Sequence, residues 1–189
     1  NALKDLGKLD EAIKAYRKAI SINPDYFEAY YNMGNVLKNL DKLDEAIKAY
    51  RKALSINPNY AEGYNNMGVT LQDQGNLGEA IEAFNKALSI KPDFSEAFNN
   101  MGNALRDQGK LDDAIKAYSK SISLRPDYIE AHHNLSSIKK YTADDKHFLQ
   151  VQDLHIRENL SEDTRCKLDF TIAKMYEDIG EISKSLSHL

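Results

Sequence analysis

The stretch from Lys42 to Tyr60 reads KLDEAIKAYRKALSINPNY, and the stretch from Lys8 to Tyr26 reads KLDEAIKAYRKAISINPDY. The two stretches start 34 residues apart and differ at two positions. The same interval of 34 residues separates each proline from the next, and the prolines are Pro24, Pro58, Pro92 and Pro126. A fixed period of this length is typical of a repeat protein, in which each unit completes the core of its neighbour.

Alignment on the prolines divides the chain of 189 residues into repeats. We expect a half repeat at 1–26, full repeats at 27–60, 61–94 and 95–128, and a degenerate segment at 129–189. The opening letters NALKDLGKLD are similar to NALRDQGKLD at 103–112, so the sequence starts in the middle of a repeat. We therefore expect a fragment, whose last hairpin is truncated at Leu189.

Each full repeat carries two apolar stripes with helical spacing. In the first full repeat the stripes are Tyr30, Met33, Gly34 and Leu37, then Leu43, Ala46, Ile47, Tyr50 and Ala53. We expect Gly34 to lie opposite Ala46, with Tyr50 filling the space toward the next hairpin. A glycine should end the first helix, because it adopts the left-handed conformation without steric cost. The residues at this position are Gly7, Asp41, Gly75 and Gly109.

The pattern aromatic-x-x-Met-Gly-x-x-Leu, then Ala-x-x-x-aromatic, then Pro, recurs in three consecutive repeats. It resembles the tetratricopeptide repeat family over 1–128 and over part of 129–141. This resemblance implies an all-α fold, a right-handed superhelical solenoid of antiparallel helix-turn-helix hairpins. It also implies a concave groove lined by the first helix of each hairpin.

The face of each first helix that lies opposite the apolar stripe should line this groove. The candidate peptide-binding residues on it are Asn32, Asn35, Asn65, Asn66, Asn99, Asn100, Asn103, Asn134 and, at the edge, Arg106. Asparagine is a mediocre helix former, yet its amide can both donate to and accept from the backbone of an extended peptide. The rows resemble the asparagine ladder in the tetratricopeptide superhelix of O-linked N-acetylglucosamine transferases.

Two alternatives stand beside peptide binding. The asparagines could persist through recent duplication, or they could bridge or cap adjacent helices. A more specific ligand is not expected: co-chaperones of this family grip a C-terminal carboxylate with Lys and Arg. Where such a Lys would stand, this chain has Tyr31, Asn65 and Asn99.

The segment after Tyr128 lacks the repeat's proline and its Ala-x-x-x-aromatic pair. Thr142 with Asp144 and Asp145 indicates one helix start, and Ser161 is expected to cap another helix. Gly180 is expected at a helix end, with a degenerate hairpin over 166–189. The sequence HHNLSSIKKYT, followed further along by LDFTIAKMYEDIGE, resembles the segment that joins tetratricopeptide repeats to a sulfotransferase domain in some bacterial proteins. This resemblance implies a downstream transferase, whose phosphate-binding loop does not occur in this sequence.

Composition and motifs argue against several functions. A net charge of −4 without clustered Lys and Arg gives no reason to expect nucleic-acid binding, and no apolar run is long enough to span a membrane. Cys166 is the single cysteine, which is compatible with a reducing, cytoplasmic location. His132 and His133 should point to different helix faces, and His147 and His155 are too far apart for one metal ion. We expect no cofactor, no metal and no catalytic constellation.

The sequence therefore predicts a non-catalytic scaffold that binds an extended peptide or partner segment in the groove. The alternative is the substrate-recruiting region of a larger transferase. Self-association through exposed terminal hairpin faces is a further expectation, because an end of a repeat array needs a cap.

Overall fold

The protein, seen in a computed structural model, is described over residues 2–158 and 160–188, with side chains from residue 8 onward. Within these ranges all regular structure is helical, which confirms the all-α prediction. The helices are α1 (Ala2–Ile22), α2 (Phe27–Asn39), α3 (Leu43–Ile56), α4 (Ala61–Asp73), α5 (Leu77–Ile90), α6 (Ser95–Asp107), α7 (Leu111–Leu124), α8 (Ile129–Ile138), α9 (Lys146–His155), α10 (Glu162–Asp178) and α11 (Ile182–Leu186).

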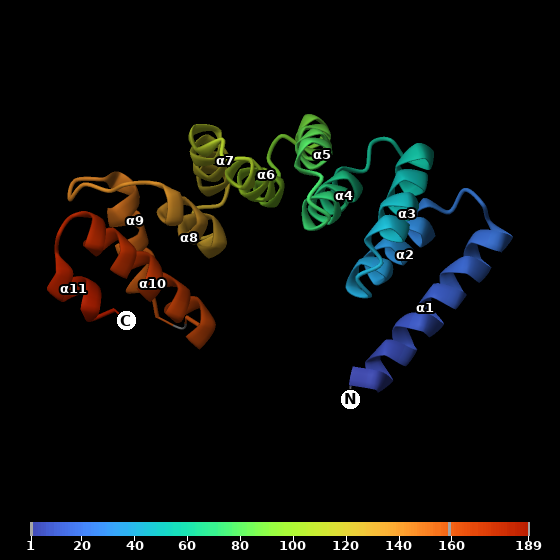
Figure 1. Cartoon of the computed structure of the whole chain (residues 1–189), viewed down its shortest axis with the longest axis horizontal. Coiled ribbons are helices and arrows are strands. Elements are labelled where there is room, and N and C mark those ends of the chain that lie inside the picture. The colour runs from blue at the N-terminus through green and yellow to red at the C-terminus, as the bar shows by residue number, and fades with distance from the viewer. Residues whose placement is uncertain (1, 159, 189) are drawn as a thin grey trace. The chain divides into compact units, whose positions relative to one another are not determined.

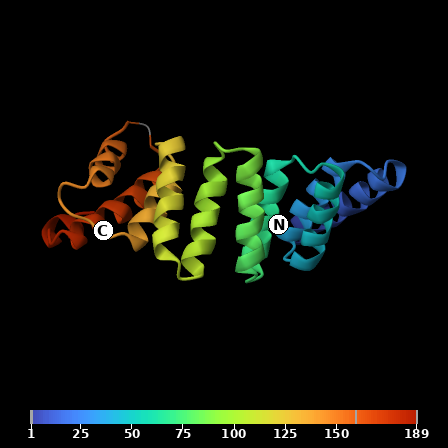
Figure 2. The ribbon, with the colours of Figure 1, turned by 90° about the horizontal axis from the view of Figure 1, so that it is seen from above.

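The chain divides into two compact units, Asn1–Ala104 and Leu105–Leu189, with the division inside α6. Figure 1 shows the order of the helices along each unit. Within the first unit, α2 and α3 form one hairpin and α4 and α5 the next, while α1 packs on α2 and α3 on α4. Figure 2 shows α3, α4 and α5 lying side by side, as expected for consecutive hairpins.

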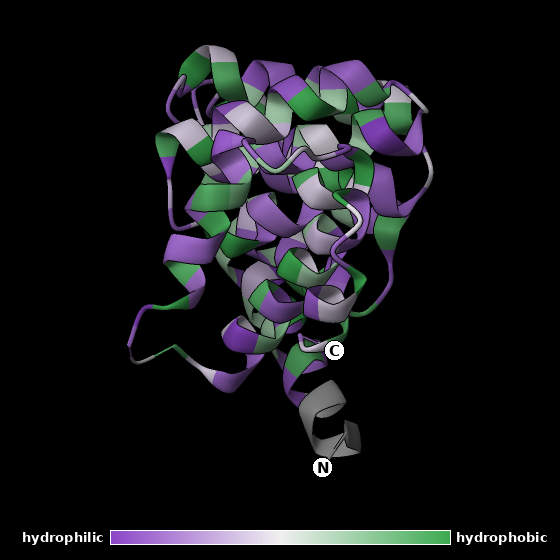
Figure 3. Ribbon diagram, turned by 90° about the vertical axis from the view of Figure 1, so that its left-hand side faces the viewer, coloured by the Kyte–Doolittle hydropathy of each residue, from purple (hydrophilic) through white to green (hydrophobic). Residues whose placement is uncertain are grey.

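The hairpin helices of the first unit are amphipathic. Figure 3 shows hydrophobic and hydrophilic residues sharing the same helices, rather than separate hydrophobic and hydrophilic helices. In α3 the buried residues include Ala46, Tyr50 and Ala53, which recur at the spacing of one helical face. A single hairpin cannot cover such a face, so consecutive hairpins bury it between them. None of the described helices combines the length and the apolar character needed to cross a membrane.

The turn inside each hairpin follows the predicted chemistry. Asp41 has a φ of 58°, and Gly75, Gly109 and Gly180 have φ values of 84°, 77° and 82°. At the first of these turns, the N–H of Lys42 donates to the carbonyl oxygen of Leu37 at 2.9 Å. The equivalent bond recurs at the other three turns, so all four helices end in the same Schellman-type arrangement.

Gly7 was wrongly expected to end a helix, because α1 continues through it from Ala2 to Ile22. The residues between Ala2 and Gly7 amount to less than two helical turns. A separate helix of this length would have little surface with which to pack against the residues after Gly7. A continuous helix instead pairs the backbone N–H and C=O groups on both sides of Gly7.

The spacing of small and aromatic residues, which recurs from repeat to repeat, has a direct packing cause. A Cβ atom added to Gly34 would lie 2.7 Å from Cε1 of Tyr50, and one added to Gly68 would lie 2.7 Å from Cε1 of Phe84. From the sequence, each aromatic ring was expected to fill the space toward the next hairpin. In the structure each ring packs directly against the glycine of its own hairpin. Met67 of the next hairpin then packs against the cluster that contains Tyr50.

The second unit has a core of its own. Its buried cluster draws on α9 and α10, and its members are Tyr141, Phe148, Val151, Leu154, Leu168, Ile172 and Met175. The helix expected to start at Thr142 with Asp144 and Asp145 begins at Lys146, where Asp145 caps α9 by accepting from the N–H of His147. Ser161 caps α10 as predicted, by accepting from the N–H of Thr164. The degenerate hairpin is formed by α10 and α11, and α10 begins at Glu162, four residues before the expected start.

Candidate peptide-binding surface

The asparagines of the first unit bond to one another across neighbouring first helices. Nδ2 of Asn66, on α4, donates to the Tyr31 hydroxyl at 2.8 Å and to Asn35 Oδ1 at 3.1 Å, both on α2. The Tyr50 hydroxyl donates to the same Asn35 oxygen at 2.7 Å. Both acceptor positions of Asn35 are therefore occupied.

The bonding continues along α4 to α6. Asn65 Nδ2 donates to Asn66 Oδ1 at 3.3 Å, and Asn100 Nδ2 donates to Asn65 Oδ1 at 3.0 Å. We call Asn35, Asn66, Asn65 and Asn100 the amide chain. It links three successive first helices, so the bridging alternative raised by the sequence is realised for these four residues. Peptide binding by the same face stays a prediction.

The nine predicted site residues differ in what they can offer a ligand. Asn65 and Asn99 are only 7% and 4% exposed, and the other asparagines are partly buried. Asn32 forms no hydrogen bond with the described part of the chain, and Asn35 donates none from its own amide. Asn103 lies on α6, in the first unit, whereas Arg106 and Asn134 lie in the second unit.

Sequence reasoning missed an aromatic cluster at the edge of the amide chain. Tyr31 occupies the position that Asn65 and Asn99 hold in later repeats. Its ring meets that of Tyr60 edge to face at 4.9 Å, and Phe27 meets Tyr60 in the same way at 5.3 Å. Burial, reinforced by Tyr31, raises the pKa of the Tyr60 hydroxyl well above its usual range. The sequence signal that could have indicated this cluster is the tyrosine at position 31, where the later repeats carry an asparagine.

Three cations on the helices that carry these residues, or next to them, form ion pairs. Lys38 lies 3.4 Å from a carboxylate oxygen of Asp73, and Lys91 lies 3.2 Å from one of Glu62. Arg106 bonds to its neighbour Asp107 at 3.1 Å. Pairs this exposed contribute little stability, but they reduce the positive charge that these cations present to a carboxylate ligand.

Two equivalent pockets recur beside the hairpins of the first unit. One has a volume of about 250 Å³ and includes Tyr30, Met33 and Leu37 in its lining. The other, of about 210 Å³, is lined by the residues 34 positions later. Arg51 bonds to Glu79 at 2.7 Å at the rim of the second pocket. The pockets follow from the repeat itself and share an apolar floor with a charged rim.

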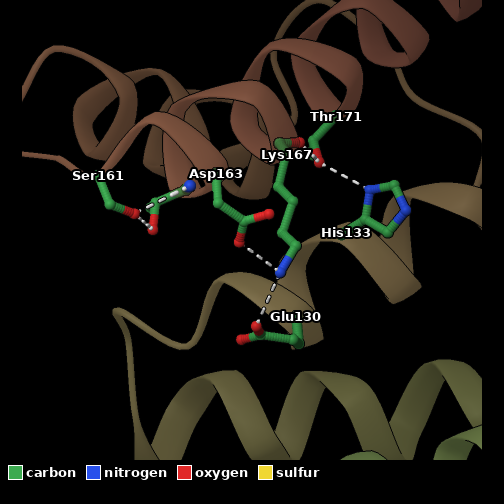
Figure 4. A network of polar contacts seen from close by, with 7 residues as sticks. Glu130, His133, Ser161, Asp163, Lys167 and Thr171 are labelled. Carbon is green, nitrogen blue, oxygen red and sulfur yellow. Dashed lines mark hydrogen bonds and ion pairs between the residues drawn. The ribbon is translucent and has the colours of Figure 1, made fainter. Parts of the chain in front are cut away.

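In the second unit, α10 covers part of the face where the groove rows would continue. Figure 4 shows Lys167 of α10 between Asp163, at 2.9 Å, and Glu130 of α8, at 3.4 Å. His133 Nδ1 lies 3.2 Å from the Thr171 hydroxyl. Glu130 and His133 stand 34 residues after Glu96 and Asn99 of the preceding first helix, and both are engaged by α10.

A buried chain of rings lies between α8 and α9. His132 Nε2 lies 2.9 Å from the Pro126 carbonyl oxygen, and His132 Nδ1 lies 2.8 Å from His147 Nε2. The Tyr141 hydroxyl lies 2.8 Å from His147 Nδ1. These three hydrogen bonds can all form with neutral imidazoles. His132 Nε2–H then donates to the Pro126 carbonyl oxygen, His147 Nε2–H donates to His132 Nδ1, and the Tyr141 hydroxyl donates to His147 Nδ1. Burial, reinforced by His132, lowers the pKa of His147 to about 3.

One group of possible metal ligands is found among the described residues, and it lies in the second unit. His155 Nε2 and His188 Nδ1 each lie 2.8 Å from Oδ1 of Asp169. The ligand atoms of the three residues all lie within 4.8 Å of one another. From the sequence, only histidines within one helix were considered as ligands of one metal ion. This cluster was therefore missed, because its three members come from separate elements.

Comparison with known proteins agrees with the hairpin architecture. Profiles described as "TPR repeat" match residues 1–41 and 102–137, and profiles described as "Tetratricopeptide repeat" match 27–60, 61–94 and 83–116. No curated protein matches the sequence.

Several solved structures have a fold similar to that of this chain. "Crystal structure of MamA" has a TM-score of 0.67 at 22% identity and covers 96% of this chain and 94% of its own. "MamA RS-1 ArsTM double mutant" has a TM-score of 0.69 at 24% identity, with coverage of 79% and 86%. "First TPR of Spaghetti (RPAP3) bound to HSP90 peptide SRMEEVD" has a TM-score of 0.58 at 25% identity, with coverage of 59% and 89%. With matches that run from residue 1 to 137, the chain belongs to the tetratricopeptide repeat family.

Proposed function

We propose that the chain is a non-catalytic interaction module that binds an extended segment of a partner protein. The contact surface would be the first-helix face of the first unit, around Asn32, Asn35 and the Tyr31–Tyr60 ring pair. Family membership supports a protein-interaction role, and a solved relative of this fold holds a peptide.

The observation that carries the proposal is the unused hydrogen-bonding capacity of Asn32 and Asn35. Asn35 is held in place by Tyr50 and Asn66 through its oxygen, which leaves its two N–H donors for a ligand. Asn32, about one turn earlier on α2, makes no side-chain hydrogen bond to any residue that the structure describes, so its amide can both donate to and accept from a ligand. A side chain positioned in advance loses less conformational entropy when it binds.

The chemistry favours a peptide recognised through its backbone rather than an acidic tail. Lys38, the cation nearest to Asn35 along α2, is already paired with Asp73. The rings of Tyr31 and Tyr60 beside the amides suit an apolar or aromatic side chain of the ligand. We therefore expect a linear segment with an apolar residue, read by amide contacts to its main chain.

The test uses a displayed library of random linear peptides, selected on the whole chain. Asn32→Ala should weaken a selected peptide about tenfold, because one lost hydrogen bond is worth roughly 1.4 kcal/mol. Asn85→Ala is the matched control, since Asn85 is an exposed asparagine on α5. Equal affinities of both variants for every selected peptide, or failure to select any peptide, would count against the proposal.

The acidic peptide SRMEEVD provides a specificity control in the same binding assay. We expect it to bind more weakly than the selected peptides. Stronger binding that depends on Asn32 would contradict the expected ligand chemistry. The other predicted role, a recruiting region of a larger transferase, stays a prediction of the sequence.

A further inference from the structure

We propose that His155, Asp169 and His188 form a binding site for a divalent transition-metal ion, with Zn²⁺ as the ion that best fits the donors. The inference is independent of peptide binding, because all three residues lie in the second unit. We call these residues the zinc triad.

The geometry of the zinc triad is close to that of a metal centre. Zn²⁺ binds imidazole nitrogen and carboxylate oxygen at about 2.0–2.2 Å, so the ligand atoms of a tetrahedral site lie roughly 3.3 Å apart. Here both nitrogens lie 2.8 Å from the Asp169 oxygen, and all three atoms lie within 4.8 Å of one another. The two nitrogens must therefore move away from the carboxylate oxygen to make room for an ion between the three atoms.

The three ligands come from three separate elements. His155 is the last residue of α9, Asp169 lies within α10, and His188 follows α11. Ordering three such side chains around one carboxylate oxygen costs conformational entropy. As neutral imidazoles the two rings can each donate their one N–H to Asp169. To bind Zn²⁺ through the same nitrogen atoms, each ring would carry its proton on its other nitrogen, so the imidazoles stay neutral and the lone pairs face the ion.

Neighbouring side chains hold His188 in the required place. The Tyr176 ring stacks on the His188 ring at 5.8 Å with an interplanar angle of 22°. The Tyr176 hydroxyl in turn accepts a hydrogen bond from Gln152 Nε2 at 3.0 Å. Supporting contacts of this kind orient metal-binding side chains.

The zinc triad borders a pocket of about 220 Å³. Asp169 and His188 form part of its lining, together with Arg165 and the exposed thiol of Cys166. Three protein ligands leave the fourth position of Zn²⁺ open to a water molecule or to another donor from this pocket. The ion would join the end of α11 to α9 and α10.

The other histidines are engaged elsewhere. His132 and His147 are buried in their ring chain, and His133 contacts Thr171. An exposed thiol, by contrast, is an obvious competing ligand for zinc. The experiment therefore uses the whole chain without a polyhistidine tag and with Cys166→Ser.

Zn²⁺ alone is the probe, titrated in competition with a chromophoric chelator. We expect one equivalent bound, and a loss of affinity on the order of 100-fold or more in His155→Gln, Asp169→Asn and His188→Gln. His133→Gln is the matched control and should bind as the Cys166→Ser chain does. Equal zinc binding by the His155→Gln/His188→Gln double variant, or no binding by the Cys166→Ser chain, would overturn the proposal.

A second measurement needs no change to the zinc triad, so it stays valid if a variant fails to fold. Nitrogen NMR of the five histidine rings in the Cys166→Ser chain should show zinc-dependent shifts at His155 and His188. Shifts that spare these two rings would refute the site.

Discussion

The amide of Asn66 donates to Oδ1 of Asn35 at 3.1 Å, from one first helix to the next. This bond gives asparagine a structural reason to recur in the repeat, beyond any contact with a ligand. Asn66 and Asn100 were expected from the sequence to bind a peptide, and their hydrogen bonds give both residues a structural role as well. Both side chains belong to the amide chain, so their loss should affect stability.

Asn66→Ala should lower the free energy of unfolding by about 1 kcal/mol. The lost bonds to Tyr31 and Asn35 cost about 1–2 kcal/mol, and the better helix propensity of alanine returns about 0.5 kcal/mol. Urea unfolding followed by circular dichroism would measure the change. Asn85→Ala provides the comparison, and an equal or smaller effect in Asn66→Ala would argue against a structural role.

Gly34→Ala should destabilise the protein by about 1–3 kcal/mol, because its Cβ would lie 2.7 Å from the fully buried Tyr50 ring. Gly78→Ala is the matched variant, since nothing lies within 4 Å of a Cβ at this position in α5. There the change should stabilise by about 0.5 kcal/mol through helix propensity. Thermal unfolding of the pair would show opposite signs, and a shared sign would contradict the packing argument.

Asp41→Gly should stabilise the protein by about 1 kcal/mol, because Asp41 holds a φ of 58° at the turn where later repeats use glycine. The reciprocal change, Gly75→Ala, should cost about 1 kcal/mol at a φ of 84°. Denaturant midpoints of the two variants would test the sign of each effect. A loss of stability in Asp41→Gly would show that the Asp41 side chain contributes more than the backbone strain costs.

Stability should fall between about pH 6.5 and pH 3 through the buried histidines. Burial holds the folded-state pKa of His147 at about 3, below its ordinary value of 6.5, so the unfolded chain binds the proton first. The neutral ring therefore contributes its full stability above pH 6.5, and this contribution is lost as the pH falls toward 3. Each pKa unit corresponds to about 1.4 kcal/mol.

The pH effect can be separated from that of the carboxylates. Asp145 and Asp169 also have lowered pKa values, but the stability they contribute is lost mainly below pH 4. His147→Gln should flatten the slope of unfolding free energy between pH 6.5 and pH 4.5. If the slope is unchanged in this variant, a group other than His147 causes the pH dependence of stability in this range.

The repeat period, the helix stripes and the turn residues were predictable because they depend on local chemistry that the sequence repeats in register. Tyr50 and Gly34, for example, each occupy one fixed place in a 34-residue pattern. The structure nonetheless showed that the ring lies on that glycine, since the direction of a side chain depends on how two helices pack. Gly7 shows the same limit: a turn residue ends a helix only where a partner helix stabilises the turn.

The all-helical repeat follows from the amino-acid sequence, since apolar spacing and left-handed turn residues act within a few residues of one another. Which polar groups meet depends instead on how the helices pack. Asn66 reaches Asn35 over 31 residues of sequence, His132 reaches His147 over 15, and Asp169 reaches His155 over 14 and His188 over 19. Such contacts depend on helix packing and on the end of each helix, and a hydrogen bond fails with displacements smaller than the uncertainty of any sequence-based placement.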